Sequence, residues 1–235
     1  MDAFDLPAEV DWRLLETKRP LSTAEQIAEQ ISHDILAGVY NPGERIIEQL
    51  IADTFQVSRG PVREAIRILE REGVVEILPR RGAQVTSLSI KEIDDLFAIR
   101  ATLIALGASL ATPLISDEDL ALVRRWINQL SKAYSGGCTT ADYVPISYRI
   151  SLFLTRRCGN ERLFEMIRSM SRQTLRYSYL SLATPERRKR SVSLWNDLAK
   201  ALEARDSTES ANLARCLIEE SGKAAREHLS SAEKE

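Results

Sequence analysis

The first third of the chain carries apolar residues at helical spacing. A first run starts at Ser22 or Thr23, either of which would cap a helix, and stops at Gly38. A second run ends just before Ser58, which would cap a third run reaching about Glu72. The apolar positions of the three runs are Ile27, Ile31, Ile35 and Leu36; Ile47, Leu50, Ile51 and Phe55; and Val62, Ala65, Ile66 and Leu69. The pattern predicts three consecutive helices.

The period of the pattern changes after Gly73. Residues 74–78 have the composition of a strand, 79–82 contain the Pro and Gly of a turn, and 83–86 return as a second strand. Three helices followed by a hairpin form a winged helix-turn-helix. We therefore expect a lead-in segment at 1–22 and a winged helix-turn-helix DNA-binding domain at 23–87.

The rest of the chain, residues 88–232, shows only helical patterns, and we expect no strand after Ser89. Proline and glycine residues interrupt the helical patterns, as at Thr112-Pro113 and Thr184-Pro185. The predicted helices cover 90–111, 117–134, 143–157, 160–182, 186–205 and 207–229. Short loops between such segments predict an all-helical bundle of six to seven helices. The fold class is therefore mainly α.

Composition narrows the class of protein. Of 235 residues, 44% are apolar, which is enough for a globular core. The cysteines Cys138, Cys158 and Cys216 are too far apart to pair as metal ligands and are odd in number, which favours a reducing cytoplasm. The N-terminus has no apolar leader, and no apolar stretch reaches the roughly 20 residues of a membrane span. The expectation is a cytoplasmic protein with no membrane partner.

Basic residues gather at two places in the front domain. Arg59, Arg63 and Arg67 are four residues apart, so they project from one face of the third helix, opposite its apolar stripe. Such a face suits a major groove, because arginine binds phosphates and pairs with guanine. The turn at 80–82 adds Arg-Arg-Gly at the tip of the hairpin. The plain alternative is a solvated helix face partnered by nearby glutamates, and the formal net charge of the whole chain, −2, does not by itself point to DNA.

The front domain closely resembles the GntR-type winged-helix repressors. Five blocks match in order, at 41–46, 48–52, 57–65, 69–75 and 81–85. In that family the Ser-Arg-x-x-Val-Arg segment opens the recognition helix, and the Arg-Gly of the wing enters the minor groove. Together with Arg67 from the helix face, the candidate DNA-binding residues are Ser58, Arg59, Gly60, Arg63, Arg67, Arg81 and Gly82. Gly60 fits either a close approach to DNA or a tolerated first-turn glycine.

The helical half resembles the FCD (FadR C-terminal-like) branch of the same family, through looser blocks at 95–100, 158–163 and 198–206. Members of this branch are usually dimers that bind small carboxylates or other metabolites. Many hold a divalent metal on one Asp and three His. By position these ligands fall at Ser147, Ser151, Trp195 and either Leu217 or Ile218, none of which is a normal ligand. We therefore expect neither metal nor cofactor.

By the same resemblance, Arg100 matches an arginine of the family on the first helix of the bundle. Because Arg100 lies among Leu96, Ile99, Leu103 and Leu106, we expect it to be partly buried, with either an internal salt bridge or a bound anion as its partner. The other candidate effector-binding residues are Ser147, Tyr148, Ser151 and Trp195, although Trp195 also suits an ordinary core position.

The basic run 187–190 is expected to be a solvated helix start, with an auxiliary DNA or partner contact as the alternative. No nucleophile motif, Gly-rich phosphate loop or metal set indicates an enzyme. The sequence therefore predicts a DNA-binding transcriptional regulator, a repressor, that binds palindromic double-stranded operator DNA as a homodimer. A small-molecule effector, a carboxylate bound without metal, would control it. The alternative is a ligand-free or partner-controlled DNA-binding dimer in which the bundle only dimerises.

Overall fold

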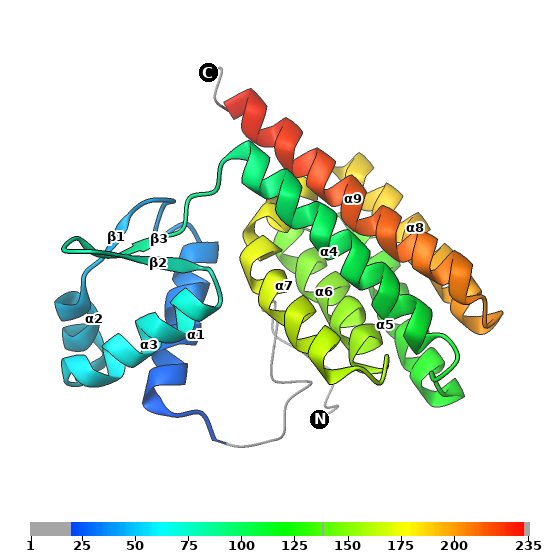
Figure 1. Cartoon of the computed structure of the whole chain (residues 1–235). Coiled ribbons are helices and arrows are strands. Elements are labelled where there is room, and N and C mark those ends of the chain that lie inside the picture. Colours follow the sequence, from blue (N-terminus) through cyan, green and yellow to red (C-terminus); the bar gives the residue numbers. More distant parts are fainter. Residues whose placement is uncertain (1–19, 138, 233–235) are drawn as a thin grey trace. The chain divides into compact units, whose positions relative to one another are not determined.

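The computed structural model describes residues 20–137 and 139–232 (Figure 1). Most of the expected lead-in 1–22 and Cys138 lie outside the described residues. The chain divides into two compact units, with the boundary between Ser89 and Ile90. The first unit contains three helices and a small sheet, and the second contains only helices in its described part. The mainly α fold with a winged helix-turn-helix and a helical bundle is therefore confirmed.

The three helices of the first unit are α1 (Thr23–Leu36), α2 (Glu48–Phe55) and α3 (Arg59–Arg71). Ser22 and Glu25 form a capping box that starts α1, as the sequence predicts. Gln56 takes a left-handed conformation with a φ of 52° and ends α2. Ser58 is the N-cap residue of α3, but its side chain makes no capping hydrogen bond.

The wing is a three-stranded antiparallel sheet with the order β1-β3-β2. Its strands are β1 (Arg45–Ile46), β2 (Val75–Leu78) and β3 (Gly82–Val85). The hairpin of β2 and β3 is the predicted one, with Leu78 opposite Gly82. The sequence analysis missed β1, because two residues show no period and this strand exists only through its pairing with β3.

The core of the first unit contains the apolar faces that the sequence predicts. Its buried residues are Ile27, Ala28, Ile31, Ile35, Ile46, Ile51, Ala52, Val62, Ala65, Ile66, Leu69, Val75, Ala83 and Val85. Because α3 gives this core only one stripe, its opposite face is left to solvent.

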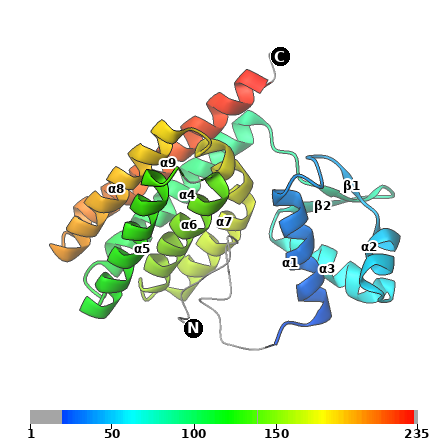
Figure 2. The same cartoon turned by 180° about the vertical axis from the view of Figure 1, so that it is seen from behind.

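Within residues 90–137 and 139–232, the second unit is a bundle of six helices (Figures 1 and 2). Its helices are α4 (Ile90–Ala111), α5 (Asp117–Ser135), α6 (Thr140–Arg156), α7 (Glu161–Ser181), α8 (Pro185–Glu203) and α9 (Ser207–Ala232). Each lies within three residues of its predicted bounds. Shifts of three residues occur at the end of α9 and at the start of α6, which begins earlier because Thr139 and Asp142 form a capping box.

Helices α4 and α9 pack closely and run antiparallel. The Arg226–Asp94 ion pair and the Arg215–Thr102 hydrogen bond connect them at successive levels. Between these levels a Cβ on Gly222 would lie 2.8 Å from the Cβ of Phe97, so this approach requires glycine. In the described part of the chain, no helix has both the length and the apolar content to cross a membrane.

Candidate nucleic-acid interface and buried cavity

The outer face of α3 presents three arginines. Arg59, Arg63 and Arg67 are all exposed, and the stripe that includes Val62 and Ala65 is buried. The helical spacing therefore places the guanidiniums as the sequence predicts. Ser58 is also exposed at the start of this helix, and its hydroxyl is not used as a cap.

Two of these arginines contact α2. Arg59 donates from Nε to Oε1 of Gln49 over 2.8 Å, and Arg63 donates from Nε to Glu48 over 2.9 Å. The Arg63–Glu48 pair is exposed, and such pairs contribute about 1 kcal/mol or less. These contacts orient the arginines but are weak. The sequence analysis missed both partners, because it considered only glutamates on α3 or just after it.

The wing tip is exposed and basic. Arg81 and Gly82 are both exposed, and Arg80 and Gly82 have positive φ angles of 63° and 82°. Arg45 on β1 lies against this turn and donates a hydrogen bond to the carbonyl of Arg81. Arg45 is a basic residue of the wing that the sequence analysis missed, because its place depends on the unpredicted strand β1.

Gly60 lies in the first turn of α3. A Cβ there would have only the Oγ of Ser58 within 4 Å, at 3.7 Å. Nothing within the folded chain therefore requires glycine at this position, and both interpretations of Gly60 stay open.

Arg100 is almost completely enclosed in the helical unit, with 2% of its surface exposed. Its Nε has no hydrogen-bond partner in the described chain, and its guanidinium carbon lies 4.9 Å from the centre of the Tyr148 ring. No carboxylate of the described residues pairs with it, so the internal salt bridge considered above is not found there. The buried charged side chains described in this unit are Arg100, Arg149 and Arg188, with no buried carboxylate among them.

The reason given above for the burial of Arg100 was wrong. Ile99 and Leu106 are 54% and 47% exposed, so the stripe they belong to faces outward. Arg100 instead shares the inner face of α4 with Phe97 and Ile104. The helix has apolar residues on both faces, and the sequence alone did not identify the inner one.

The other predicted effector-binding residues lie at two neighbouring places. Tyr148 is buried, and its hydroxyl contacts the hydroxyl oxygens of Ser178 at 2.7 Å and Thr174 at 3.2 Å. Ser147 is buried one residue earlier and donates to the carbonyl of Val144. Arg100 and this hydroxyl cluster form a polar layer between α4, α6 and α7.

A small cavity adjoins this layer between α4, α6, α8 and α9. The space open to the centre of a water molecule is about 20 Å³. Ser151 is one of its two polar lining residues, and its Oγ has no hydrogen-bond partner in the described chain. The lining residues are Ile104, Ala108, Ser151, Leu154, Thr155, Trp195, Leu198, Ala214, Leu217 and Ile218. Of the five predicted effector-binding residues, Ser151 and Trp195 line the cavity, whereas Arg100, Ser147 and Tyr148 do not.

The cavity brings together positions at which the resemblance implies metal ligands. Ser151, Trp195, Leu217 and Ile218 all line it. A serine hydroxyl is a poor donor for a divalent ion, and an indole or an aliphatic side chain is none. The described residues also contain no cluster of three His, Cys, Asp or Glu side chains. The residues present therefore do not fit the metal.

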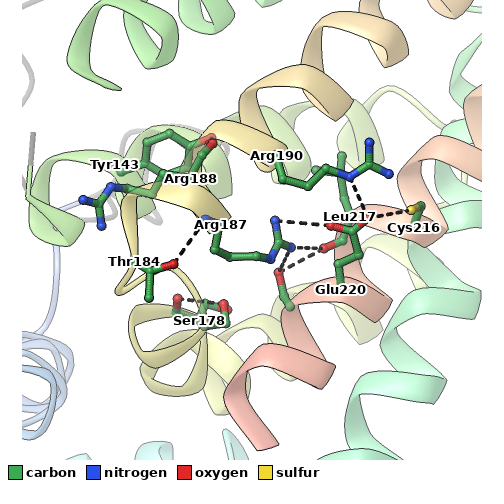
Figure 3. A network of polar contacts seen from close by, with 11 residues as sticks. Tyr143, Ser178, Thr184, Arg187, Arg188, Arg190, Cys216, Leu217 and Glu220 are labelled. Carbon is green, nitrogen blue, oxygen red and sulfur yellow. Dashed lines mark hydrogen bonds and ion pairs between the residues drawn. The ribbon is translucent and has the colours of Figure 1, made fainter. Parts of the chain in front are cut away.

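The expectation of a solvated start for the basic run 187–190 was wrong for two of its four residues (Figure 3). Arg188 is buried and donates to the carbonyls of Leu182 and Ala183 at the end of α7. Arg187 reaches α9, where it donates to Ser221 over 3.3 Å and pairs with Glu220 at 3.6 Å. These two arginines join helices, so they are not available for an auxiliary DNA contact.

Glu220 is shared by a second arginine of this run. Arg190 donates to its carboxylate over 2.9 Å, and the thiol of Cys216 donates to the same carboxylate. Burial lowers the pKa of Arg187, and Glu220 opposes that shift. Burial and the nearby carboxylate raise the pKa of the Cys216 thiol, which keeps it protonated.

Comparison with known proteins gives two matches to family models. The model described as "Bacterial regulatory proteins, gntR family" matches residues 23–85, and the FCD domain model matches residues 95–220. Two solved structures, Escherichia coli McbR/YncC and a transcriptional regulator GntR from Rhodococcus sp. RHA1, each superpose with a TM-score of 0.71. They are 22% and 20% identical, and they cover 85% and 89% of this chain and 94% and 99% of their own. At that identity they show the shared fold.

Several curated proteins are also similar. The uncharacterized HTH-type transcriptional regulator YdhC of Bacillus subtilis is 30% identical over 60% of this chain and 63% of its own length. The Nta operon transcriptional regulator of Aminobacter aminovorans is 30% identical over 56% of this chain and 62% of its own. The chain thus spans less than two thirds of both. The HTH-type transcriptional repressor GlaR of E. coli is 28% identical over 79% of this chain and 87% of its own.

Proposed function

The chain belongs to the GntR family of bacterial regulatory proteins and carries an FCD domain, and from that premise we propose that it is a metabolite-controlled transcriptional repressor. It acts in the cytoplasm, where its DNA lies, and it binds a palindromic operator as a homodimer. A small anion bound in the helical unit, without a metal, changes its hold on the operator. The proposal is a regulator and not an enzyme.

The DNA contacts are proposed on the outer face of α3 and the wing tip. One observation carries this step: α3 buries a single stripe and leaves Arg59, Arg63 and Arg67 together on the exposed side. Guanidiniums on such a face pair with guanine edges or phosphates in a major groove. Ser58 and Gly60 lie at the start of this helix, where a phosphate is bound by backbone amides and hydroxyls. Arg81 and Gly82 enter the adjacent groove, with Arg45 beside them.

A homodimer follows from the size of such a contact. One recognition helix covers only a few base pairs, so a specific site requires two half-sites related by two-fold symmetry. The proposed operator is therefore a palindrome.

The effector site is proposed at Arg100. A guanidinium with 2% of its surface exposed and no carboxylate partner in the described chain is costly to bury, unless an anion joins it. Tyr148 and Ser147 lie on the neighbouring turn of α6, and Ser151 and Trp195 line the adjoining cavity. The positive charge that a metal supplies elsewhere in the family is supplied here by Arg100. The ligand is therefore a carboxylate or similar anion with a polar or small apolar remainder.

The small size of the cavity supports a second candidate, a ligand-free or partner-controlled dimer. About 20 Å³ of space for a water centre holds roughly one water molecule. A metabolite therefore requires the bundle to open, whereas a purely dimerising bundle does not. A panel of small carboxylic acids separates the two, because a bound ligand at 100 times its Kd adds about 2.7 kcal/mol of stability.

DNA binding is tested by selecting sequences from random DNA with the full chain and measuring the affinity of variants for the selected site. We expect the double variant Arg59→Ala/Arg63→Ala to lose at least about 30-fold in affinity, because each contact contributes about 1–3 kcal/mol. The matched control is Arg71→Ala, which removes an exposed arginine near the other end of α3. An enriched site whose affinity is unchanged in the folded double variant would contradict the proposed contacts, and no enrichment at all would contradict DNA binding.

A further inference from the structure

The cavity beside Arg100 has an apolar wall with a single available hydroxyl. Ser151 and Thr155 are its two polar lining residues, and none of the lining residues carries a charge. The Thr155 hydroxyl is already used, because it donates to the carbonyls of Ser151 and Leu152 within its own helix. The Ser151 Oγ is buried and has no hydrogen-bond partner in the described chain. A cavity with such a wall holds apolar groups better than it holds water.

The buried charge lies at one end of this cavity. Helices α4 and α6 run in the same direction here, because Arg100 lies over Tyr148 and, further along both helices, Gly107 approaches Thr155. Ile104 follows Arg100 on the same inner face of α4, one helical turn or about 6 Å further along the axis. Ile104 lines the cavity. A ligand that reaches from the guanidinium into the cavity therefore extends along both helices.

The surroundings of the cavity neutralise one negative charge. The other buried charged side chains described in the helical unit are Arg149 and Arg188. Arg188 donates to two carbonyls at the end of α7, and Arg149 lies 5.9 Å from the centre of the Trp126 ring on α5. A second carboxylate on the ligand would be buried against aliphatic side chains without a partner, which is strongly unfavourable. We therefore expect a ligand with a single carboxylate, paired with Arg100.

The wall also selects against ligands that are rich in oxygen. A divalent ion binds several oxygens at once, so a metal site favours acids with hydroxyl or further carboxyl groups. Here Trp195, Leu217 and Ile218 stand at positions where the resemblance implies metal ligands. These side chains pack well against an alkyl group but leave a ligand hydroxyl without a hydrogen bond. Ser151 can donate one hydrogen bond, which a carboxylate oxygen next to Arg100 accepts.

We propose that the effector is a short-chain aliphatic monocarboxylate, with its carboxylate at Arg100 and Ser151 and its alkyl chain in the cavity. This rests on the effector site of the proposed function and specifies the chemical class of its ligand. The chain is short, because the space open to the centre of a water molecule is about 20 Å³, enough for roughly one water. Each further carbon must displace side chains of the wall.

The first test titrates the full chain with a series of straight-chain acids, from acetate to octanoate, in a calorimeter. We expect Kd to fall by about fourfold for each added CH₂ until one optimal length, because each CH₂ leaves water for an apolar wall. Beyond that length Kd should rise, since the chain overfills the bundle. Pentanedioate adds a second carboxylate to the chain of pentanoate and should bind at least about 100-fold more weakly.

The second test changes the size of the cavity. Leu217→Ala enlarges it and should move the optimum to a longer acid. The matched control is Leu130→Ala, which removes an equally buried leucine of α5 outside the cavity and should keep the optimum of the parent. If Leu217→Ala does not fold, Ala214→Val narrows the cavity and should move the optimum to a shorter acid. A variant that only loosens the bundle weakens all the acids alike and leaves the optimum in place.

The outcomes separate this inference from the proposed function. Pentanedioate or 2-hydroxypentanoate binding as tightly as pentanoate overturns the monocarboxylate class and leaves a carboxylate effector standing. An optimum that stays in place in the folded cavity variants, or that moves equally in Leu130→Ala, overturns the placing of the alkyl chain in the cavity. A chain that binds none of these acids, charged once or more, overturns both the inference and the proposed effector.

Discussion

Arg100 is the residue at which stability and function are most directly opposed. Its guanidinium is enclosed, lies over the Tyr148 ring and has no carboxylate partner in the described chain. A stacked aromatic ring contributes about 2 kcal/mol or more to a desolvated cation, which is only part of the hydration energy that such a charge loses. An apolar side chain of similar length would fill the same space without that cost. The folded protein therefore carries a positive charge that an anionic ligand would neutralise.

Replacing Arg100 with Met should separate these two roles. We expect the variant to be at least as stable as the parent without ligand, because it removes a buried unpaired charge and keeps the volume. It should also lose its response to the ligand. The carboxylic acid that raises the melting temperature of the parent should no longer raise that of the variant.

The control for Arg100→Met is Arg125→Met, which removes an exposed arginine from another helix of the bundle, α5. An Arg100→Met protein that keeps the full ligand-induced rise would place the anion elsewhere.

Close approach of helices in the bundle depends on glycine, which has no side chain. Helices α4 and α9 approach closely at Gly222, where an added Cβ would lie 2.8 Å from the Cβ of Phe97 and 2.9 Å from its Cγ. These atoms belong to the first part of a buried side chain, which cannot move aside without shifting α4. The single glycine of α9 therefore allows the helix carrying Arg100 to pack closely.

Gly222→Ala should lower the stability of the helical unit by about 1–3 kcal/mol, the usual range for overpacking. Alanine by itself raises helix stability, so the measured loss is a lower limit on the cost of the clash. The same substitution at Gly60 is the control, because that position is open, and we expect it to leave stability equal or higher. Urea denaturation of both variants checks this.

Phe97→Ala provides a further check on the Gly222 contact, because it removes the ring carbons and keeps only the Cβ. If the clash is with the Phe97 ring, the double variant should lose less than the sum of the single losses. Additive losses would show that another atom limits the approach.

The two units of the molecule are linked through α4. This helix begins five residues after β3 ends, and it carries Arg100 on its inner face and the exposed Ile99 and Leu106 on its outer face. The candidate DNA interface and the proposed effector site are therefore connected along one stretch of chain. The helical unit is also held by ion pairs between distant segments, such as Arg124 of α5 with Glu203 of α8.

The pH dependence of stability should reflect two carboxylates of the helical unit. Hydrogen bonds from Thr139 lower the pKa of Asp142, and the hydrogen bond with Arg124 lowers the pKa of Glu203. Because both pKa values are depressed in the folded state, their stabilising effect is present above the ordinary values of 3.8 and 4.5 and is lost as the pH falls below them. Melting temperature should therefore decrease steadily from about pH 5 toward pH 3.

Glu203→Gln tests this interpretation. The variant should melt below the parent at pH 7, and the difference should shrink as the pH falls below 4.5, because the stabilising effect of a carboxylate with a depressed pKa is lost there. Glu118→Gln is the control, because Glu118 is exposed and forms no ion pair among the described residues. A Glu203→Gln difference that stays constant with pH would show that the loss comes from packing and not from charge.

The sequence by itself determined the features that depend on near neighbours along the chain. The extents of the helices, the cap at Ser22, the wing hairpin and the shared face of Arg59, Arg63 and Arg67 all follow from spacings of two to four residues. Hydrogen bonds of helices, caps and tight turns form over those same distances. A local pattern therefore contains the information that local structure requires.

Only the tertiary structure decided the features that depend on partners far along the chain. The strand β1 exists because Arg45 and Ile46 pair with Gln84 and Ala83. Arg188 is buried because the end of α7 packs over it, although its sequence neighbours are charged. The burial of one face of α4 also depends on distant partners, because this helix has apolar residues on both faces. Which face is buried depends on α6, α7 and α9, because burial is set by whatever packs nearby in space and leaves no mark in the local spacing.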